Sequence, residues 1–454
     1  MVKQNGNRDV SRFHYIYRFG IPTEASGQSP VSVFGLARSG IAAAKRLAAA
    51  GARVTITEKK AATEFDTEVI KDLKARGVAV EFGGHSENAV QSAELIVVSP
   101  GIHLDLPILQ EARDRRIPII SEIELAYRFL KKPIIAVTGT NGKTTTTTLI
   151  GEMLKAGGKK VAVAGNIGNP LVEVDDTELD YVVAEISSYQ LEAVVDFKPW
   201  ISVILNIQPD HLERHKTMEE YVKMKARVFA NQAGDDYVVY NLDDPAVAKM
   251  VQNANAKLIG FTKSHPGIIT LALEAIKIPG KHNLENALAA ANVAYLCGIK
   301  SNVVAEVLRT FPGVEHRIEF TASVNGVEYY NDSKATNPDS TLVALETFRG
   351  KGIILILGGR DKGVSLDALA ARVKELVRDV VLIGEAADRF EAALKAAGYN
   401  SIQRADSMQS AVKLSASLAK PGEVILLSPA CASFDMFRDF EERGRVFKAC
   451  VKQN

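Results

Sequence analysis

The sequence predicts an α/β protein of three domains, each built on a mostly parallel sheet. Apolar strand-like runs alternate with helical patterns from residue 31 onward, which is typical of βαβ units with helices on both faces of a sheet. The chain has 454 residues, and one hydrophobic core seldom grows beyond about 250–300 residues. Three runs, Val31–Phe34, Ile134–Val137 and Ile353–Leu357, lead into glycine-rich turns. We interpret each as the first strand of a separate sheet.

These starting points divide the chain into four segments. Residues 1–29 form an N-terminal extension that lacks the continuous apolar core and cleavage site of a secretory signal. We expect the three domains to span residues 30–121, 122–313 and 314–454. The last boundary follows the turn signal Pro312-Gly313.

The composition argues against several classes of function. The net charge is +1, from 55 basic and 54 acidic residues, so no global field attracts nucleic acid or an anionic membrane. No apolar run reaches the length that spans a bilayer. Cys297, Cys431 and Cys450 show no C-x-x-C spacing, which is typical of a reducing compartment and argues against a disulfide framework or structural zinc. We expect a cytoplasmic protein without nucleic-acid binding or membrane insertion.

The first strong motif is a phosphate-binding loop. The apolar run Pro133–Val137 leads into Thr138-Gly-Thr-Asn-Gly-Lys143, and a helix follows. Backbone N–H groups at such a turn bind phosphate, the lysine adds a positive charge, and the hydroxyl of Thr144 is suited to Mg²⁺. The generic motif has glycine where this chain has Val137, so the loop is a variant. The alternative is a strand-to-helix turn without phosphate; the Gly-Lys-Thr-Thr ending favours a nucleoside triphosphate.

Two further strand-like runs end in polar residues. Glu185 follows the run Tyr181–Ala184, and Asp210-His211 follows the run Ile201–Leu205. Functional groups of α/β proteins gather at the carboxyl ends of strands, so Glu185 and His211 are candidate Mg²⁺ ligands beside the phosphate loop. Each residue taken singly could equally be a helix cap or a satisfied core residue.

A helix predicted over Met218–Gln232 carries a lysine on its apolar face. The apolar residues recur at helical spacing, and Lys225 falls inside their stripe. Burial disfavours the charged form, so the pKa of Lys225 should fall. A neutral amine can capture CO₂ as a carbamate, which turns a cation into a metal-binding anion. The alternative is a lysine at the edge of the stripe whose ammonium reaches solvent.

The first and third domains carry weaker loop motifs. Gly35-Leu-Ala-Arg-Ser-Gly40 is close to a dinucleotide fingerprint, but Ala37 replaces its second glycine, which weakens an NAD-binding interpretation. In the third domain, Asn331–Asn337, Gly358–Gly363 and Leu427–Phe437 place charged and hydroxyl groups after strand-like runs. They suggest a face that contacts carboxylate or phosphate, although each alone could be turn chemistry.

Over residues 31–450 these motifs resemble those of the Mur ligase family. The most specific are residues 139–145, 185–191, 210–211, 280–283, 316–317, 331–337 and 428–433. The resemblance implies a Rossmann-like N-terminal domain that binds a UDP-linked precursor, a P-loop-type central ATPase domain, and a Rossmann-like C-terminal domain that binds the amino acid. It also implies a monomeric, ATP-dependent amide ligase that adds D-glutamate to UDP-N-acetylmuramoyl-L-alanine through an acyl phosphate, in peptidoglycan precursor synthesis.

The resemblance further implies roles for single residues. ATP would be bound by Gly139, Thr140, Asn141, Gly142, Lys143, Thr144, Thr145, Asn283, Arg317 and Asp332. Two Mg²⁺ ions, or Mn²⁺ in their place, would be held by Thr144, Glu185, His211 and a carbamate of Lys225 with CO₂. The expected catalytic residues are Lys143, Glu185, His211 and Lys225. The UDP-linked precursor would contact Arg38, Ser39, Glu58, Lys59, Gly101, Asn166, Ser187, Gln190 and His211. The D-glutamate would contact Lys334, Thr336, Lys362, Ser433 and Phe440.

Other functions remain open from the sequence. A sister ligase or a folylpolyglutamate synthase shares the phosphate loop, but the Asn331–Asn337 and Ser428–Ser433 motifs favour D-glutamate. A nucleotide-switch protein would not explain an inward-facing Lys225 beside a histidine. Ala37 counts against an NAD-dependent oxidoreductase.

Overall fold

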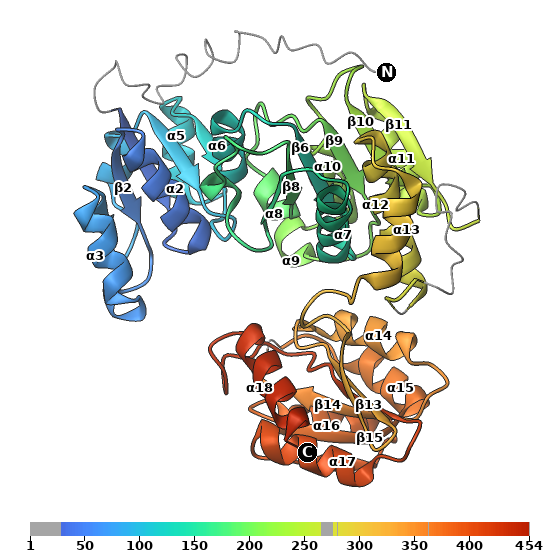
Figure 1. The fold of residues 1–454 in the computed structure, drawn as a ribbon. Helices are drawn as coiled ribbons and strands as arrows, with labels where there is room; N and C mark the ends of the chain where they lie inside the picture. The colour runs from blue at the N-terminus through green and yellow to red at the C-terminus, as the bar shows by residue number, and fades with distance from the viewer. Residues whose placement is uncertain (1–28, 265–275, 279, 362, 454) are drawn as a thin grey trace. The chain divides into compact units, whose positions relative to one another are not determined.

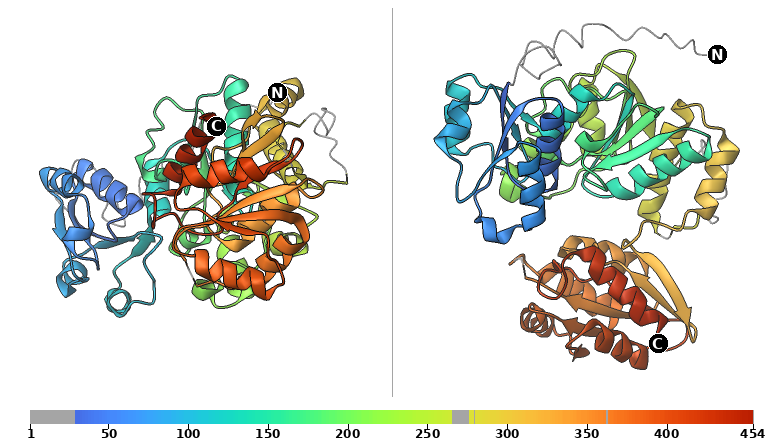
Figure 2. Two further views of the ribbon diagram at one scale, coloured as in Figure 1. Left: turned by 90° about the horizontal axis from the view of Figure 1, so that it is seen from below. Right: turned by 60° about the vertical axis from the view of Figure 1, so that its left-hand side comes forward.

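The computed structural model describes residues 29–264, 276–278, 280–361 and 363–453 (Figures 1 and 2). The chain forms two compact units, the first from residues 1–270 and 285–307 and the second from residues 271–284 and 308–454. Lys362 and nearly all of the predicted N-terminal extension lie outside the described residues. Among the helices that these ranges contain, none combines the length and apolar content that a membrane crossing needs.

The first sheet of the first unit is wholly parallel. Its strand order is β3-β2-β1-β4-β5, so the order reverses at β1, the place where doubly wound sheets bind their ligands. The strands are β1 (Pro30–Phe34), β2 (Arg53–Thr57), β3 (Ala79–Glu81), β4 (Leu95–Val98) and β5 (Ile119–Ser121). The helices between them are α2 (Arg38–Ala49), α3 (Thr67–Ala75), α4 (Glu87–Gln91) and α5 (Pro107–Asp114).

The second sheet of this unit is parallel in the order β11-β10-β9-β6-β8-β7. Its strands are β6 (Ile134–Thr138), β7 (Val161–Gly165), β8 (Tyr181–Glu185), β9 (Ile201–Ile204), β10 (Tyr237–Asn241) and β11 (Lys257–Phe261). The helices from the end of β5 onward are α6 (Glu122–Phe129), α7 (Lys143–Ala156), α8 (Ser188–Leu191), α9 (Leu212–His215), α10 (Met218–Ala226), α11 (Pro245–Met250), α12 (Lys281–Leu296) and α13 (Ser301–Thr310). Because β6 lies between β8 and β9, the residues that follow these three strands meet at one edge of the sheet.

Helix α6 connects the two sheets through two buried carboxylates. Glu124 accepts hydrogen bonds from the amides of Val195, Asp196 and Phe197 at 2.9, 3.0 and 2.8 Å. Glu122 accepts from the amide of Val172 at 2.7 Å, and burial raises its pKa to about 7. Through these hydrogen bonds the two carboxylates hold α6, which directly follows the first sheet, against segments of the chain that forms the second sheet.

The second unit holds the third sheet, in the order β12-β13-β17-β14-β15-β16. The strands are β12 (Glu319–Val324), β13 (Val327–Asn331), β14 (Ile353–Gly358), β15 (Val377–Ile383), β16 (Ile402–Arg404) and β17 (Val424–Leu427). Apolar cores on its two faces pack α14 (Pro338–Thr347), α15 (Asp367–Leu376) and α16 (Ala387–Ala396) on one side, and α17 (Met408–Leu418) and α18 (Phe440–Lys452) on the other. Helices α17 and α18 contact each other; they belong to the part of the chain coloured toward red in Figure 2.

The fold class is confirmed as α/β with three sheets, while two local expectations were wrong. Strand β14 does not open its sheet, because the antiparallel hairpin β12–β13 precedes it; Asn325 and Gly326 form its turn with φ of 51° and 77°, as two-residue hairpin turns require. The helix expected over residues 218–232 ends at Ala226. Beyond it, Val228 and Phe229 bond to carbonyls three residues back, the tighter turn common at helix ends.

Candidate active site

The phosphate loop lies between β6 and α7 and is held by residues that follow β9. The amide of Asn141 donates to Asn206 Oδ1 at 2.8 Å, and Asn206 Nδ2 donates to the carbonyl of Asn141 at 3.1 Å. The amide of Gln208 donates to Thr140 Oγ1 at 3.0 Å. Helix α7 has no side-chain N-cap. Its first amides are therefore left for an anion, as in other phosphate-binding helices.

Gly142 cannot be replaced without a collision. It caps α7 in the left-handed conformation with φ of 83°, and a Cβ atom there would lie 2.2 Å from Asn286 Oδ1. Asn286, on α12, is 3% exposed and its Oδ1 accepts from Thr146 Oγ1 at 3.2 Å. Asn286 is a site residue that the sequence did not single out. It lies three residues after Asn283, which ends the predicted motif 280–283, and this helical spacing is the signal that could have found it.

Lys143 lies at the first position of α7 and is half-buried, rather than on the exposed turn that its sequence context suggests. Its Nζ donates to the carbonyls of Gly139 and Thr140 at 2.9 and 2.7 Å. The lysine therefore folds back over the loop that it follows. The phosphate oxygens of a nucleotide would be stronger, charged acceptors for the same ammonium.

Glu185 ends β8 next to the phosphate loop, since Val137 of β6 pairs with it. The residue is 2% exposed, and its Oε1 accepts from Asn166 Nδ2 at 2.7 Å. Its other oxygen, Oε2, is buried and has no hydrogen-bond partner within the described part of the chain. A buried carboxylate oxygen needs a cation or a donor. The site therefore fits a divalent cation.

His211 adopts a left-handed backbone, with φ of 55°, a conformation that is uncommon outside glycine. Its ring lies 4.8 Å from the ring of Tyr189, and its Nε2 is 3.3 Å from Asp210 Oδ2. His211 is half-buried and lies at the same edge of the sheet as Glu185. Its imidazole nitrogens are ligands that bind Mn²⁺ or Zn²⁺ more readily than Mg²⁺. Its role as a metal ligand stays a prediction.

Lys225 is buried as predicted, with 1% of its surface exposed. Its Nζ donates to the carbonyl of Gly139 at 2.9 Å and lies 4.7 Å from the ring centroid of Tyr221. Lys143 donates to the same carbonyl. Burial, and then the charge of Lys143, hold the pKa of Lys225 well below its ordinary value. The amine is thus suited to carbamate formation; the carbamate itself is not tested by these contacts.

His215 is a second histidine at this edge, and the sequence did not single it out. It is 6% exposed, and its Nε2 lies 3.0 Å from Ser188 Oγ. Burial lowers the pKa of His215. Its ring lies 5.3 Å from that of Tyr221, whose hydroxyl is 3.1 Å from Thr140 Oγ1. The only sequence signal is its position four residues after His211.

The residues expected to bind the UDP-linked precursor lie in the first unit. Arg38 starts α2, and its guanidinium donates to the carbonyl of Gly168. Glu58 accepts from the amide of Leu36 at 2.8 Å, so one of its oxygens shapes the first glycine-rich loop. Ser39, Lys59 and Gly101 are half-buried or exposed.

Ser187 and Gln190 cap the N-terminus of α8. The Oγ of Ser187 accepts from the amide of Gln190 at 3.4 Å, and Gln190 Oε1 accepts from the amide of Ser187 at 2.9 Å. This reciprocal pair is a capping box at the start of α8. Their predicted contact with the precursor stays untested.

In the second unit, Asp332 follows β13 and is buried, at 4% exposed. Ser428 Oγ donates to its Oδ2 at 2.7 Å, and the amide of Ile318 donates to its Oδ1 at 3.2 Å. Burial raises the pKa of Asp332 to about 7, against the lowering effects of Ser428 and Arg317. Lys334 lies with its Nζ 5.6 Å from the ring centroid of Phe440.

The other second-unit residues expected at the site lie nearby in the chain. Ser433 is 2% exposed, and its carbonyl accepts from Phe437 at 2.8 Å. Thr336 is half-buried, directly before the N-cap of α14. The structure thus brings the Asn331–Asn337 and Ser428–Ser433 motifs together, because β13 and β17 are parallel neighbours.

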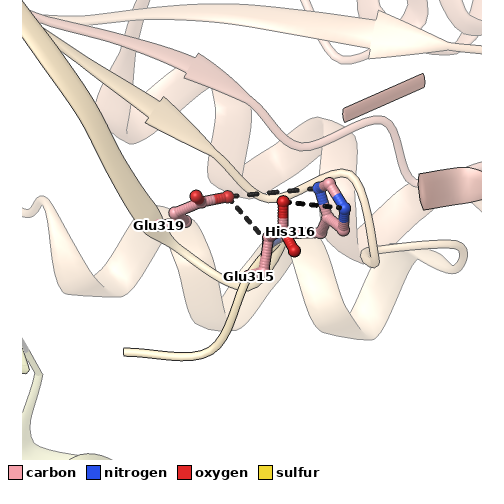
Figure 3. Close-up of side chains that lie close together, drawn as sticks. All are labelled: Glu315, His316 and Glu319. Atoms are coloured by element: carbon pink, nitrogen blue, oxygen red, sulfur yellow. Dashed lines mark hydrogen bonds and ion pairs between the residues drawn. The ribbon is translucent and has the colours of Figure 1, made fainter. Parts of the chain in front are cut away.

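Glu315, His316 and Glu319 form a cluster of potential metal ligands at the entrance to β12 (Figure 3). The cluster already contains a cation, because Lys448 Nζ lies 2.6 Å from Glu315 Oε1 and 2.9 Å from Glu319 Oε1. His316 Nδ1 lies 2.9 Å from Asn331 Nδ2. Both carboxylates are therefore already paired with an ammonium of the protein, and the cluster differs from the expected site around Glu185.

Comparison with protein families matches most of the chain in three segments. Residues 29–121 match the N-terminal domain described as Mur ligase MurD-like, residues 137–272 the Mur ligase middle domain, and residues 316–431 the glutamate ligase domain of Mur ligases. A UDP-N-acetylmuramoylalanine–D-glutamate ligase of Thermoanaerobacter sp. (strain X514) is 45% identical over 448 residues, which covers 93% of this chain and 98% of that protein. The Koribacter versatilis protein of the same name is 42% identical over 447 residues and covers 93% and 97%.

Solved structures agree at the level of the fold. The UDP-N-acetylmuramate–alanine ligase of Thermotoga maritima gives a TM-score of 0.58 at 22% identity and covers 93% of this chain and 99% of its own. The ADP-bound folylpolyglutamate synthase of Mycobacterium tuberculosis gives 0.56 at 14% identity and covers 70% and 90%.

Proposed function

The chain belongs to the Mur ligase family, and from this premise we propose that it joins D-glutamate to UDP-N-acetylmuramoyl-L-alanine at the expense of ATP, in peptidoglycan precursor synthesis. The near-full-length similarity to ligases named for this reaction supports the choice of substrates. The observation that carries the chemistry is the buried Glu185, with its unsatisfied Oε2, beside the uncapped start of α7. We expect a monomer in the cytoplasm, where ATP and UDP-linked precursors are available.

The phosphate loop positions ATP and neutralises its charge. The amides that open α7 bind the phosphates, and Lys143 exchanges the carbonyls of Gly139 and Thr140 for phosphate oxygens. The terminal carboxylate of the precursor then attacks the γ-phosphorus, the bond to the bridging oxygen of ADP breaks, and an acyl phosphate forms. In such transfers the protein contributes chiefly orientation and charge stabilisation.

Thr144, Glu185, His211 and a carbamate on Lys225 are the residues that would hold the metal ions. When bound, Mg²⁺ supplies charge neutralisation for the phosphoryl group. The depressed pKa of Lys225 supports the carbamate, since only the neutral amine reacts with CO₂. Carbamate formation also removes a positive charge from beside Lys143, which shares the Gly139 carbonyl.

The second step forms the amide bond. The amine of D-glutamate attacks the carbonyl carbon of the acyl phosphate, inorganic phosphate leaves, and the nitrogen loses a proton. Lys334, Thr336, Ser433 and Phe440 are the described residues that we assign to the amino acid; Lys362 lies outside the described residues. Arg38, Ser39, Glu58, Lys59, Gly101 and Asn166 are assigned to the precursor, with Asn283, Arg317 and Asp332 assigned to ATP.

The proposal is tested by phosphate release from ATP with UDP-N-acetylmuramoyl-L-alanine and a panel of amino acids. We expect turnover with D-glutamate and none with L-alanine, L-lysine or diaminopimelate. Lys143→Met serves as the loss-of-activity control, because the half-buried side chain is replaced by an apolar one of similar length. Turnover with UDP-N-acetylmuramate and L-alanine instead would assign the chain to the alanine-adding ligases, and turnover with a folate would assign it to the folylpolyglutamate synthases.

A further inference from the structure

Arg443 is the largest side chain that the second unit buries completely, at 1% exposed. It is the fourth residue of α18, whose first residue is Phe440. Nothing in the proposed chemistry uses it. A buried arginine is uncommon unless its charge and its donors are satisfied, so its contacts identify its role.

The guanidinium of Arg443 joins two loops that follow neighbouring strands. Its Nε and Nη2 donate to Ser333 Oγ and to the Ser333 carbonyl at 2.9 and 2.7 Å. Its Nη2 and Nη1 also donate to the carbonyls of Cys431 and Ala432 at 3.0 and 3.3 Å. Ser333 Oγ donates in turn to the carbonyl of Phe440 at 2.8 Å. One side chain therefore fixes the loop after β13, the loop after β17 and the start of α18 relative to one another.

Two glycines are required by this arrangement. A Cβ atom on Gly359 would lie 2.3 Å from the carbonyl of Ala432 and 3.1 Å from Arg443 Nη1. A Cβ atom on Gly444 would lie 2.1 Å from His316 Nδ1. Gly359, in the glycine-rich turn after β14, thus leaves room for the guanidinium. The hydrogen-bond partners of Arg443 lie in two of the three motifs that the sequence assigned to this face, and Gly359 belongs to the third.

The charge of Arg443 has no direct counter-ion. No carboxylate oxygen of the described chain lies within ion-pair distance of it, and its four hydrogen bonds go to neutral oxygens. Burial lowers the pKa of Arg443 to about 10, while Cys431, Asp435 and Asp332 raise it. The side chain stays protonated at neutral pH. Its positive potential therefore persists in a poorly screened interior.

We propose that Arg443 is the positioning residue of the amino-acid pocket and the source of a fixed positive potential that favours an acidic amino acid. The proposal rests on the proposed function, because the pocket assigned to D-glutamate comprises Lys334, Thr336, Ser433 and Phe440. Lys334 directly follows Ser333 and Ser433 directly follows Ala432 in the chain, so a shift of the arginine's partners moves both pocket residues. Positioning errors of this kind weaken the binding of one substrate selectively.

A purely structural role predicts a different result. If Arg443 only stabilised the unit, its loss would lower the amount of folded enzyme and leave the KM of every substrate unchanged. Arg378 offers a matched control in the same unit. It lies at the start of β15, the opposite end of the sheet, where it pairs with Glu423 at 2.6 Å and donates to the carbonyl of Leu418.

The experiment measures the KM of D-glutamate, ATP and the precursor for Arg443→Lys, Arg443→Met and Arg378→Met at saturating concentrations of the other substrates. We expect the KM of D-glutamate to rise about tenfold for Arg443→Lys, which keeps the charge but loses the fork of donors, and about a hundredfold for Arg443→Met. The KM values of ATP and precursor should change by less than about twofold. Arg378→Met should lower the melting temperature without changing the KM of D-glutamate.

Chemical rescue separates positioning from folding. Guanidinium at low concentration should lower the KM of D-glutamate for Arg443→Ala and leave Arg378→Ala unaffected. An unchanged KM of D-glutamate in folded Arg443→Lys and Arg443→Met enzymes, or an equal rise in all three KM values, would overturn the proposal. If the wild-type enzyme does not consume D-glutamate, the proposed function fails instead, and the same comparison is made with the amino acid that supports turnover.

Discussion

Within the described residues, each of the two units buries one lysine or arginine at the carboxyl edge of its parallel strands, and the two side chains are bound in different ways. Within the described part of the chain, Lys225 of the first unit makes a single hydrogen bond, to the carbonyl of Gly139. Arg443 in the second unit donates to Ser333, Cys431 and Ala432 through four hydrogen bonds. Both side chains are 1% exposed, so burial alone does not distinguish them.

The difference indicates what each cation is for. A buried ammonium with one acceptor is poorly compensated for its desolvation, and the pKa of Lys225 falls well below its ordinary value as a result. The desolvation cost of such a group is relieved when it loses its proton or reacts to an uncharged or anionic form. A guanidinium that donates four of its five N–H groups to fixed acceptors is better compensated and instead holds those acceptors in place. The contacts of Lys225 therefore suit a reactive group, and those of Arg443 suit a residue that fixes neighbouring loops.

Replacement of the two cations by methionine should therefore change stability in opposite directions. Lys225→Met should keep or raise the melting temperature and lower activity about 10²–10³-fold, because it removes a poorly compensated charge together with the metal ligand that we propose. Arg443→Met should lower stability by about 2–4 kcal/mol, because it removes the donor that Arg443 supplies to the Ser333 hydroxyl and to the carbonyls of Ser333, Cys431 and Ala432. Thermal melts and phosphate release measure both effects.

Lys225→Ala provides the control for the carbamate. A short-chain carboxylic acid should restore part of its activity by supplying the missing negative group, and it should have no effect on Lys225→Met, whose side chain fills the space. A Lys225→Met enzyme that is both destabilised and active would show that Lys225 resembles Arg443 after all.

Gly142 and Gly158 flank the two ends of α7, and replacing each by alanine tests whether the backbone is more closely packed at the phosphate loop than at the other end of the helix. Gly142→Ala should lower stability by about 2–3 kcal/mol and abolish nucleotide binding, because its Cβ atom would lie 2.2 Å from Asn286 Oδ1 in addition to the strain of φ 83°. Gly158→Ala, at the other end of the helix with φ of 79° and nothing within 4 Å, carries the strain alone. It should cost about 1 kcal/mol and leave nucleotide affinity unchanged. Equal effects on ATP binding in a titration would contradict the proposed contact.

A pH dependence of stability extends the comparison from buried cations to buried carboxylates. Glu124 is saturated by backbone amides, whereas Glu122 Oε2 has no partner within the described residues. The folded pKa of Glu122 is about 7 against an ordinary 4.5. The folded state therefore binds this proton more tightly, and its contribution to stability is present below pH 4.5 and is lost as the pH rises to about 7.

Glu122→Gln removes that titration. The difference in unfolding free energy between wild type and Glu122→Gln should change by up to about 3 kcal/mol across this range, in favour of the variant at pH 8. Melting temperatures at pH 5.5 and 8 measure it. The exposed Glu68→Gln is the control and should show no such change. Parallel melting curves for wild type and Glu122→Gln would show that Glu122 is ionised at both pH values.

Much of the first unit's site could be predicted because its signals are local. The glycine-rich turn was predicted directly before a helix, and Gly142 lies there in a left-handed conformation. The burial of Lys225 was predicted from helical periodicity. That prediction is confirmed although the helix is shorter than expected, because Lys225 still lies within it. Strand ends were predictable for β6, β8 and β9, because buried parallel strands are continuous apolar runs. The place of Glu185 at the edge follows from them.

The remaining features have no local signal. The contact of Asn286 with Gly142, the pairing of His215 with Ser188 and the contacts of Arg443 with Ser333 join residues that are far apart in the chain. The unsatisfied Oε2 of Glu185 likewise depends on which atoms surround it. The sequence by itself determined the α/β class, the phosphate loop, the buried lysine and the resemblance to Mur ligases, since periodicity, glycine conformation and motif order are properties of neighbouring residues. Only the tertiary structure decided which buried charges are saturated and which are left reactive, because hydrogen-bond saturation depends on acceptors that chain folding brings together from distant segments.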